Sequence, residues 1–335
     1  MAEEAESIHV PATRENIHRL ARDGILNVEA LDRALRISGD SPDRKRWVWF
    51  LDTLLLLVGV GALVSGVFFF FAFNWAGMHR YLKFGILDAA ILVAVGVAFW
   101  QGLDRLSGKI ALGAAGLLVG GLLAVYGQVY QTGADSYQLF LYWALLVAGW
   151  VWISKFTPMW VGWILLFNIS LVTFWQQIVG DIDSSLFLLI FVLNCSGVVA
   201  WEVGRAYGID WIKSVWAPRI LFIPAFTALL IPTMILIFSS SLRLVDDSLL
   251  FVLFGLFIAT SGLVLYAYSQ RRMDLFMLTV CAFGLIIAFN TWVAIFLDLE
   301  TTTLLCLSAL FIAQAALVVR WLSRVSGSWE ARNNE

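Results

Sequence analysis

Long apolar segments alternate with short polar segments along most of the chain. Each apolar segment has about 20 residues, enough for an α-helix to cross the roughly 30 Å hydrocarbon core of a bilayer. Backbone groups in lipid must find hydrogen-bond partners within their own segment, so we expect these segments to be helices. The ten predicted spans are 48–74, 84–101, 110–131, 137–154, 159–179, 185–204, 219–239, 248–269, 275–297 and 303–322.

Polar segments flank this apolar region at both ends of the chain. Residues 1–46 are predicted to form a cytoplasmic helical hairpin and a linker, residues 47–325 a ten-helix transmembrane domain, and residues 326–335 a cytoplasmic tail. In the hairpin, Thr13 and Asn27 are suited to cap two short helices. The expected fold class is therefore all-α: a polytopic membrane protein with about ten transmembrane helices and a short N-terminal cytoplasmic hairpin.

The composition supports a membrane protein and argues against several kinds of site. Hydrophobic residues make up 61% of the 335 residues and charged residues 14%, whereas soluble domains carry about 25% charged residues. No basic patch typical of nucleic-acid binding stands out. The three cysteines and three histidines are scattered without metal-ligand spacing. We expect the lipid bilayer as a partner, and no nucleic acid, metal or cofactor.

Lys and Arg residues predict the orientation of the helices. If the N-terminus is cytoplasmic, 19 of the 22 basic residues fall on the cytoplasmic side, as the positive-inside rule expects. The outer side then holds Arg80, Lys83 and Arg243. Because the predicted number of spans is even, the C-terminus is also expected in the cytoplasm.

Small residues form a stripe along the third predicted span. Gly113, Gly116 and Gly120 are separated by three and four residues, so they lie on one face of a helix. A glycine pair spaced by four lets another helix approach closely. Helix packing is one interpretation of this stripe, and backbone exposed along a substrate path is the other.

A polar segment follows the stripe at the outer end of the same span. Gln128, Tyr130 and Gln131 come first, Gly133 is suited to end the helix, and Asp135 is suited to cap the next one. A hairpin between two membrane helices explains the turn residues. Amide and phenol groups at this level also fit a hydrated pocket for a small polar ligand, so both interpretations stay open.

Other polar residues inside the spans are candidate site residues, since burying them in a membrane costs free energy. We predict that Asp88 or Asn290 helps to close the hydrated pocket, although Asp88 can instead pair with Lys83 or Arg80. Asn168 and Asn194 are each about nine residues into antiparallel spans. That spacing predicts an amide hydrogen bond between the two helices near the midplane.

The segment "GLLVGGLLAVYGQVYQTGADSYQLFLYWALL" resembles the corresponding segment of a bacterial family of predicted membrane proteins called domain of unknown function 2157. The polar N-terminal helical region followed by many spans is also similar to that family. This resemblance implies a location in the bacterial inner (cytoplasmic) membrane. It brings no reaction, ligand or catalytic residue to this chain.

Two functions fit these patterns. One is transport of a small polar solute or a lipid-linked molecule through a pocket open to the outer side, with Gln128, Tyr130, Gln131, Asp135, Asp88 and Asn290 as its binding residues. The other is a membrane scaffold or sensor that self-associates or binds a protein partner through residues 12–38. We do not expect an enzyme, because the sequence contains no recognisable catalytic set or phosphate-binding loop.

Overall fold

The computed structural model describes residues 14–38, 44–74, 77–131, 133–241, 248–297 and 301–334. These residues form helices and connecting turns, and no strand occurs among them. The chain divides into two units, Met1–Val67 with Ser328–Glu335, and Phe68–Gly327. The all-α prediction is confirmed.

The first unit contains the predicted helical hairpin, built from α2 (Arg14–Arg22) and α3 (Val28–Ile37). The two helices pack on each other. Ile17, which follows Asn16 and precedes His18 in the sequence, is buried. The Asn27 side chain accepts a hydrogen bond from the Ala30 amide at 2.8 Å, so this residue caps α3 as expected. The other predicted cap, Thr13, lies outside the described residues.

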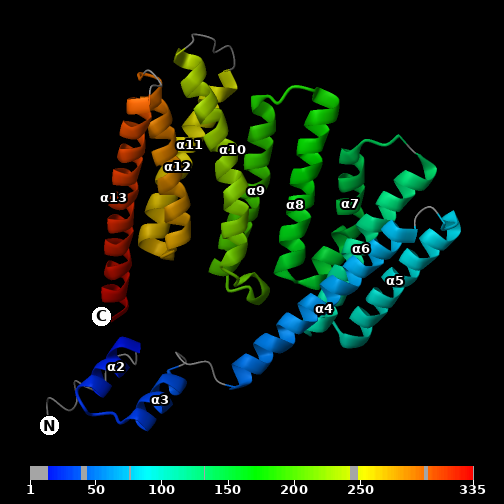
Figure 1. The fold of residues 1–335 in the computed structure, drawn as a ribbon, viewed down its shortest axis with the longest axis horizontal. Coiled ribbons are helices and arrows are strands. Elements are labelled where there is room, and N and C mark those ends of the chain that lie inside the picture. Colours follow the sequence, from blue (N-terminus) through cyan, green and yellow to red (C-terminus); the bar gives the residue numbers. More distant parts are fainter. Residues whose placement is uncertain are drawn as a thin grey trace. The chain divides into compact units, whose positions relative to one another are not determined.

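Among the described residues, ten helices are long and apolar enough to cross a membrane, which confirms the predicted number of spans; Figure 1 shows their arrangement. They are α4 (Arg44–Asn74), α5 (Arg80–Gln101), α6 (Leu106–Tyr130), α7 (Ser136–Ser154), α8 (Thr157–Phe174), α9 (Ser184–Ala206), α10 (Trp216–Ser241), α11 (Ser248–Ala267), α12 (Leu275–Ala294) and α13 (Thr301–Asn334). Helix α13 runs on to Asn334, so most of the segment predicted as a tail is helical.

Helices that follow one another in the second unit mostly lie side by side. Helix α5 packs on α6, α7 on α8, and α9 on α10, while α10 also contacts α11 and α12. Short connections explain this order, because neighbouring antiparallel helices need only a few residues to join them. Helices α5 and α6 therefore lie far from α12 and α13, with α7 to α10 between them (Figure 1).

Two helix ends have wider π-helical turns that the apolar pattern did not predict. They are η2 (Trp175–Val179), which extends α8, and η4 (Tyr268–Arg272), which extends α11. A short 3-10 helix, η3 (Asp210–Ile212), lies between α9 and α10. Helix α10 continues through Pro224 and Pro232, although each proline removes one backbone donor.

Aromatic and amide side chains fix the middle of the second unit. A buried cluster joins α8, α9, α10 and η3 through Val161, Ile164, Trp201, Ile212, Ala217 and Leu221. Asn168 and Asn194 donate to each other's side-chain oxygens at 3.1 and 2.6 Å, which confirms the predicted amide pair between α8 and α9.

Candidate functional site

The polar segment after the glycine stripe forms a turn between α6 and α7. Helix α6 ends at Tyr130, and Gln131 takes a left-handed conformation with φ 44°, two residues before the expected helix breaker Gly133. Asp135 occupies the N-cap position of α7, but its side chain makes no capping hydrogen bond. The structure thus places Asp135 at the predicted N-cap position, but without a capping hydrogen bond from its carboxylate.

Gln177 of the π-helical turn η2 supplies the missing interaction. Its side-chain oxygen accepts from the Tyr137 amide at 3.3 Å, and its nitrogen donates to the Ser136 hydroxyl at 2.7 Å. The start of α7 is thus capped by a residue about 40 positions away in the sequence. Sequence patterns did not predict this cap, because local capping rules consider only residues within one turn.

The tyrosines at the end of α6 pack against α5. The rings of Tyr126 and Tyr130 lie 4.9 Å apart, and Phe84 of α5 stacks on Tyr130 at 5.9 Å between ring centroids. Both tyrosines remain about half exposed. Ring packing therefore explains why aromatic residues occur at this end of the hairpin, and the exposed part of Tyr130 remains open to a ligand or to lipid.

Three of the predicted site residues have free polar groups at the surface of α5 and α6. Gln128, Gln131 and Asp88 are exposed, and their side chains have no hydrogen-bond or ion-pair partner among the described residues. The sequence suggested that Asp88 pairs with Lys83 or Arg80. Neither ion pair occurs among the residues that the structure describes. Each of these three groups is therefore accessible to water or to a ligand.

Asn290 lies apart from Gln128, Gln131 and Asp88 and bonds to a different set of residues. Its amide nitrogen donates to the Ile286 carbonyl at 2.8 Å and to the side-chain oxygen of Gln314 in α13. Its own side-chain oxygen is buried and has no hydrogen-bond partner among the residues that the structure describes. Because α12 lies on the far side of the second unit from α5 and α6, the structure does not bring Asn290 to the other predicted residues.

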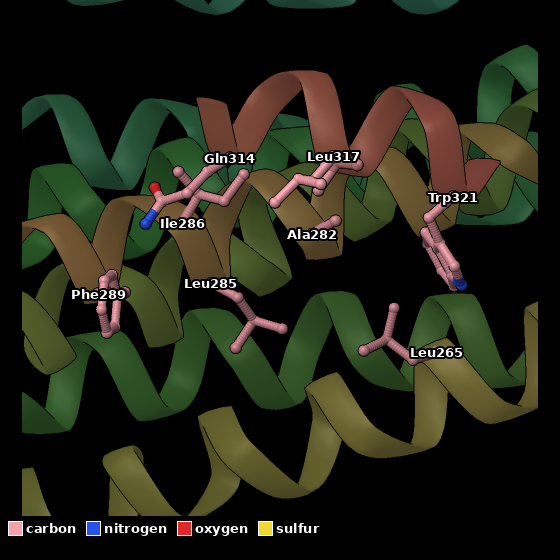
Figure 2. Close-up of a pocket in the computed structure, with 9 residues that line it drawn as sticks. Leu265, Ala282, Leu285, Ile286, Phe289, Gln314, Leu317 and Trp321 are labelled. Atoms are coloured by element: carbon pink, nitrogen blue, oxygen red, sulfur yellow. The ribbon is translucent and has the colours of Figure 1, made fainter. Parts of the chain in front are cut away.

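A groove of about 480 Å³ lies beside this amide pair. It is lined by Leu265, Ala282, Leu285, Ile286, Phe289, Gln314, Leu317, Val318 and Trp321, from α11, α12 and α13. Figure 2 shows Gln314 and Trp321 toward opposite ends of the groove, both on α13. All the lining side chains are apolar or aromatic except Gln314. The sequence analysis missed Gln314 because a single amide in an apolar run has no informative spacing.

The glycine stripe of α6 lies against α7 and α8. A Cβ atom on Gly120 would meet the Trp143 ring at 2.5 Å, whereas one on Gly116 would meet Val147 at 3.9 Å and one on Gly113 would meet Met159 at 3.9 Å. The indole of Trp143 donates to the Gly116 carbonyl at 2.7 Å. The stripe is thus in a helix–helix contact that Trp143 fills.

A second set of polar residues forms ion pairs at the ends of α9, α10 and α12. Glu202 pairs with Arg205 of its own helix and with Arg272 of η4. Arg219 of α10 pairs with Asp274 at the start of α12. No local pattern predicts the contacts with Arg272 or between Arg219 and Asp274, because each joins residues more than 50 positions apart.

These features can be compared with known proteins. The model of the family described as "Predicted membrane protein (DUF2157)" matches residues 18–160. This segment is similar to DUF2157. The match confirms the resemblance and runs from the middle of α2 to the start of α8, including Gln128, Tyr130, Gln131 and the glycine stripe. The groove and the arginine pairs lie beyond the DUF2157 match. No curated protein and no solved structure matches the chain.

Proposed function

We propose that the protein is a transporter of the bacterial inner membrane that moves a lipid-linked molecule without converting it chemically. The groove between α11, α12 and α13 is the observation that carries this proposal. Its volume of about 480 Å³ falls in the usual range of ligand sites, roughly 300–1,000 Å³. Of the two substrate classes that the sequence left open, the apolar lining favours the lipid-linked one over a small polar solute.

The position of the groove supports a lipid tail as its occupant. All lining residues belong to the candidate spans Ser248–Arg272, Leu275–Ala294 and Leu304–Trp329. In a bilayer such a groove faces acyl chains rather than water, and an apolar surface in this setting favours an apolar occupant. A prenyl or acyl chain lying along α13 between Gln314 and Trp321 satisfies this condition.

The amides at one end of the groove support a substrate with a polar group beside its tail. The side-chain oxygen of Asn290 is buried without a partner, and an unmade hydrogen bond of a buried group costs about 1–3 kcal/mol. Gln314 lines the groove directly and bonds to Asn290. A hydrogen-bond donor on the substrate would bind this amide pair more strongly than a pure hydrocarbon does.

The proposed orientation has both termini in the cytoplasm. It rests on the distribution of the basic residues, 19 of 22 of which then lie on the cytoplasmic side. The exposed residues Gln128, Gln131 and Asp88 then lie in the outer half of the membrane. The role of these residues in binding a ligand, together with Tyr130 and Asp135, stays a prediction.

Lipid transfer in proteoliposomes tests the function. Purified protein is reconstituted into vesicles containing a phospholipid with a fluorescent acyl chain, and the rate at which the label becomes accessible to a membrane-impermeant quencher is measured. We expect a rate well above that of protein-free vesicles. Leu317→Trp should fill the groove and lower this rate by at least half.

Ile312→Trp is the matched control, because Ile312 and Leu317 lie on the same helix and are 67% and 64% exposed, but only Leu317 lines the groove. Equal rates with and without protein would reject the transporter. Equal loss in both variants would reject the groove as the path.

A second candidate function, a scaffold or sensor acting through the hairpin, is favoured by exposed apolar residues. Ile25, Val28 and Ile37 are 68%, 83% and 82% exposed in the unit that contains α2 and α3. We propose that the hairpin contacts another protein or a second copy of the chain through these residues. Replacing all three with Ser should then abolish chemical cross-linking between copies or to a partner. Unchanged cross-linking would reject the contact.

A further inference from the structure

Two ion-paired groups lie at one end of α9, α10, α11 and α12: Glu202 with Arg205, Arg272 and Tyr268, and Asp274 with Arg219. The charges of Glu202 and Asp274 both act on Tyr268, so the six residues form one cluster, which we call the arginine cluster. From its geometry we propose that this cluster binds the phosphate-bearing headgroup of an anionic phospholipid. The site is separate from the groove of the proposed transport function, and its chemistry does not depend on that function.

Glu202 holds two of the arginines in place. One of its oxygens accepts from Arg205 at 3.1 Å and from the Tyr268 hydroxyl at 3.2 Å. Its other oxygen lies 3.1 Å from Arg272 as an ion pair, though without hydrogen-bond geometry. Arg272 also donates to the Glu202 backbone carbonyl at 3.0 Å. A carboxylate that is mostly buried thus fixes the direction of two guanidinium groups.

Asp274 holds the third arginine by dividing its two oxygens between two tasks. One oxygen accepts from the amides of Phe276 and Met277 and caps α12. The other accepts from Arg219 at 2.9 Å. The Arg219 guanidinium also lies over the Phe276 ring at 5.7 Å. Its two terminal nitrogens have no partner among the described residues, so they are available to an anion.

The backbone beside the cluster has two uncommon features. Tyr268 and Arg272 belong to the π-helical turn η4, and such turns occur frequently at functional sites. Met273, which follows directly, has a left-handed conformation with φ 50°. This conformation is unfavourable for a residue with a side chain. The π-helical turn and the left-handed Met273 bend the short connection between α11 and α12. Arg272 before the bend and Asp274 after it therefore both belong to the arginine cluster.

The charge of the cluster favours an anion. Three arginines face two carboxylates, which leaves one positive charge, and the exposed Arg271 adds a second beside it. The arginine side chains are partly exposed, between 23% and 37%, whereas the two carboxylates are 16% and 10% exposed. Positive groups therefore form the accessible side of the cluster. Guanidinium groups match phosphate oxygens because their donors lie in one plane.

The position of the cluster favours a lipid phosphate over a soluble one. The spans Ser184–Ala206, Trp216–Phe238, Ser248–Arg272 and Leu275–Ala294 end or begin within one turn of these residues. Since consecutive spans are antiparallel, these four ends lie on one side of the membrane. That is the level at which phospholipid phosphates lie, and basic pockets between helices bind such headgroups.

Native mass spectrometry of the detergent-purified full chain tests the site, with phosphatidylglycerol as the anionic probe and phosphatidylcholine as the neutral one. We expect tighter binding of phosphatidylglycerol. Arg205→Gln should weaken this binding about fivefold, because one positive charge near the headgroup is removed. This variant keeps Arg272 and Tyr268 on Glu202, so the cluster retains its remaining contacts.

Lys213→Gln is the matched control at the same end. Lys213 pairs with Asp210, whose carboxyl is fully exposed, and the ammonium lowers the pKa of that carboxyl. An equal loss for Lys213→Gln would show unspecific charge attraction and overturn the site. If the protein binds inorganic phosphate as tightly as phosphatidylglycerol, the lipid assignment is overturned.

A measurement on the unmodified protein covers the case in which Arg205→Gln does not fold. Photoactivatable phosphatidylglycerol should cross-link to segments 202–219 and 268–276. Cross-links distributed over all helix ends would overturn the proposal, even if the transport assay succeeded.

Discussion

At the scale of single residues, the space next to a glycine decides whether the helix accepts a side chain. Gly116 and Gly120 are one turn apart on α6, and both face α7. Trp143 lies across them with its ring at Gly120 and its indole N–H at the Gly116 carbonyl. The two glycines therefore have different tolerances, although the sequence motif treats them alike.

Gly120→Ala should destabilise the protein by about 1–3 kcal/mol, as overpacking of a filled contact does. The new Cβ would lie 2.5 Å from the Trp143 ring, which its hydrogen bond to Gly116 holds in place. Gly116→Ala is the control, since its Cβ would make an ordinary contact with Val147. Thermal unfolding in detergent measures both, and equal melting temperatures for the two variants would contradict the prediction.

The amide pair of Asn168 and Asn194 predicts a coupling between α8 and α9. Asn194→Leu should destabilise the protein, because it leaves the Asn168 amide without its partner. The double variant with leucine at both positions should cost less than the sum of the two single variants. The coupling in a double-mutant cycle is expected to be about 0.6 kcal/mol and at most about 1.7 kcal/mol. Strictly additive losses would show that the bond contributes nothing.

At the scale of elements, π-helical turns place side chains where a regular helix does not. The turn η2 brings Gln177 to the start of α7, and the turn η4 brings Arg272 to Glu202 of α9. In both cases a side chain at the end of one span bonds to residues at the end of another span. The helix ends of the second unit are therefore stabilised between elements as well as within them.

Gln177→Leu should loosen the first turn of α7, because it removes the acceptor for the Tyr137 amide and the donor to Ser136. Hydrogen exchange at residues 137–139 should become faster, and stability should fall by about 0.5–1.5 kcal/mol. Gln176→Leu is the neighbouring control, since Gln176 is exposed and has no partner among the described residues. If exchange rises equally in both variants, Gln177 is not the cap.

At the scale of the whole molecule, the ten spans give each connection a predicted side of the membrane. Asp104 and Asp135 lie at opposite ends of α6. With the N-terminus in the cytoplasm, residue 104 should face the cytoplasm and residue 135 the outside. Basic residues support this assignment, because Arg105 and Lys109 follow Asp104 directly.

Cysteine labelling checks this topology. In a variant whose three native cysteines, Cys195, Cys281 and Cys306, are replaced by alanine, Asp135→Cys should react with a membrane-impermeant maleimide added to intact cells. Asp104→Cys should react only after the cells are opened. The opposite result would invert the assignment of every connection after α5.

The sequence alone determined the membrane class, the number of spans and the pairing of Asn168 with Asn194. Apolar length and depth along a span are local quantities, and two antiparallel helices with amides at the same depth need only adjacency to pair. It also placed Gln128 and Gln131 at the end of α6. It failed where an interaction joins distant segments. The side chain of Asp135 makes no capping hydrogen bond, and the Tyr137 amide donates to Gln177 instead.

Apart from the pair of Asn168 and Asn194, only the tertiary structure decided which polar residues meet. Asn290 joins Gln314 of α13 instead of Asp88 or Gln128, because α12 packs on the α10 side of the molecule. Arg219 meets Asp274, and Arg272 meets Glu202, across helices far apart in sequence. The apolar pattern predicts the length of each helix but not which helices pack beside it. Neighbours are set by side-chain packing between helices, and that packing formed both the groove and the arginine cluster.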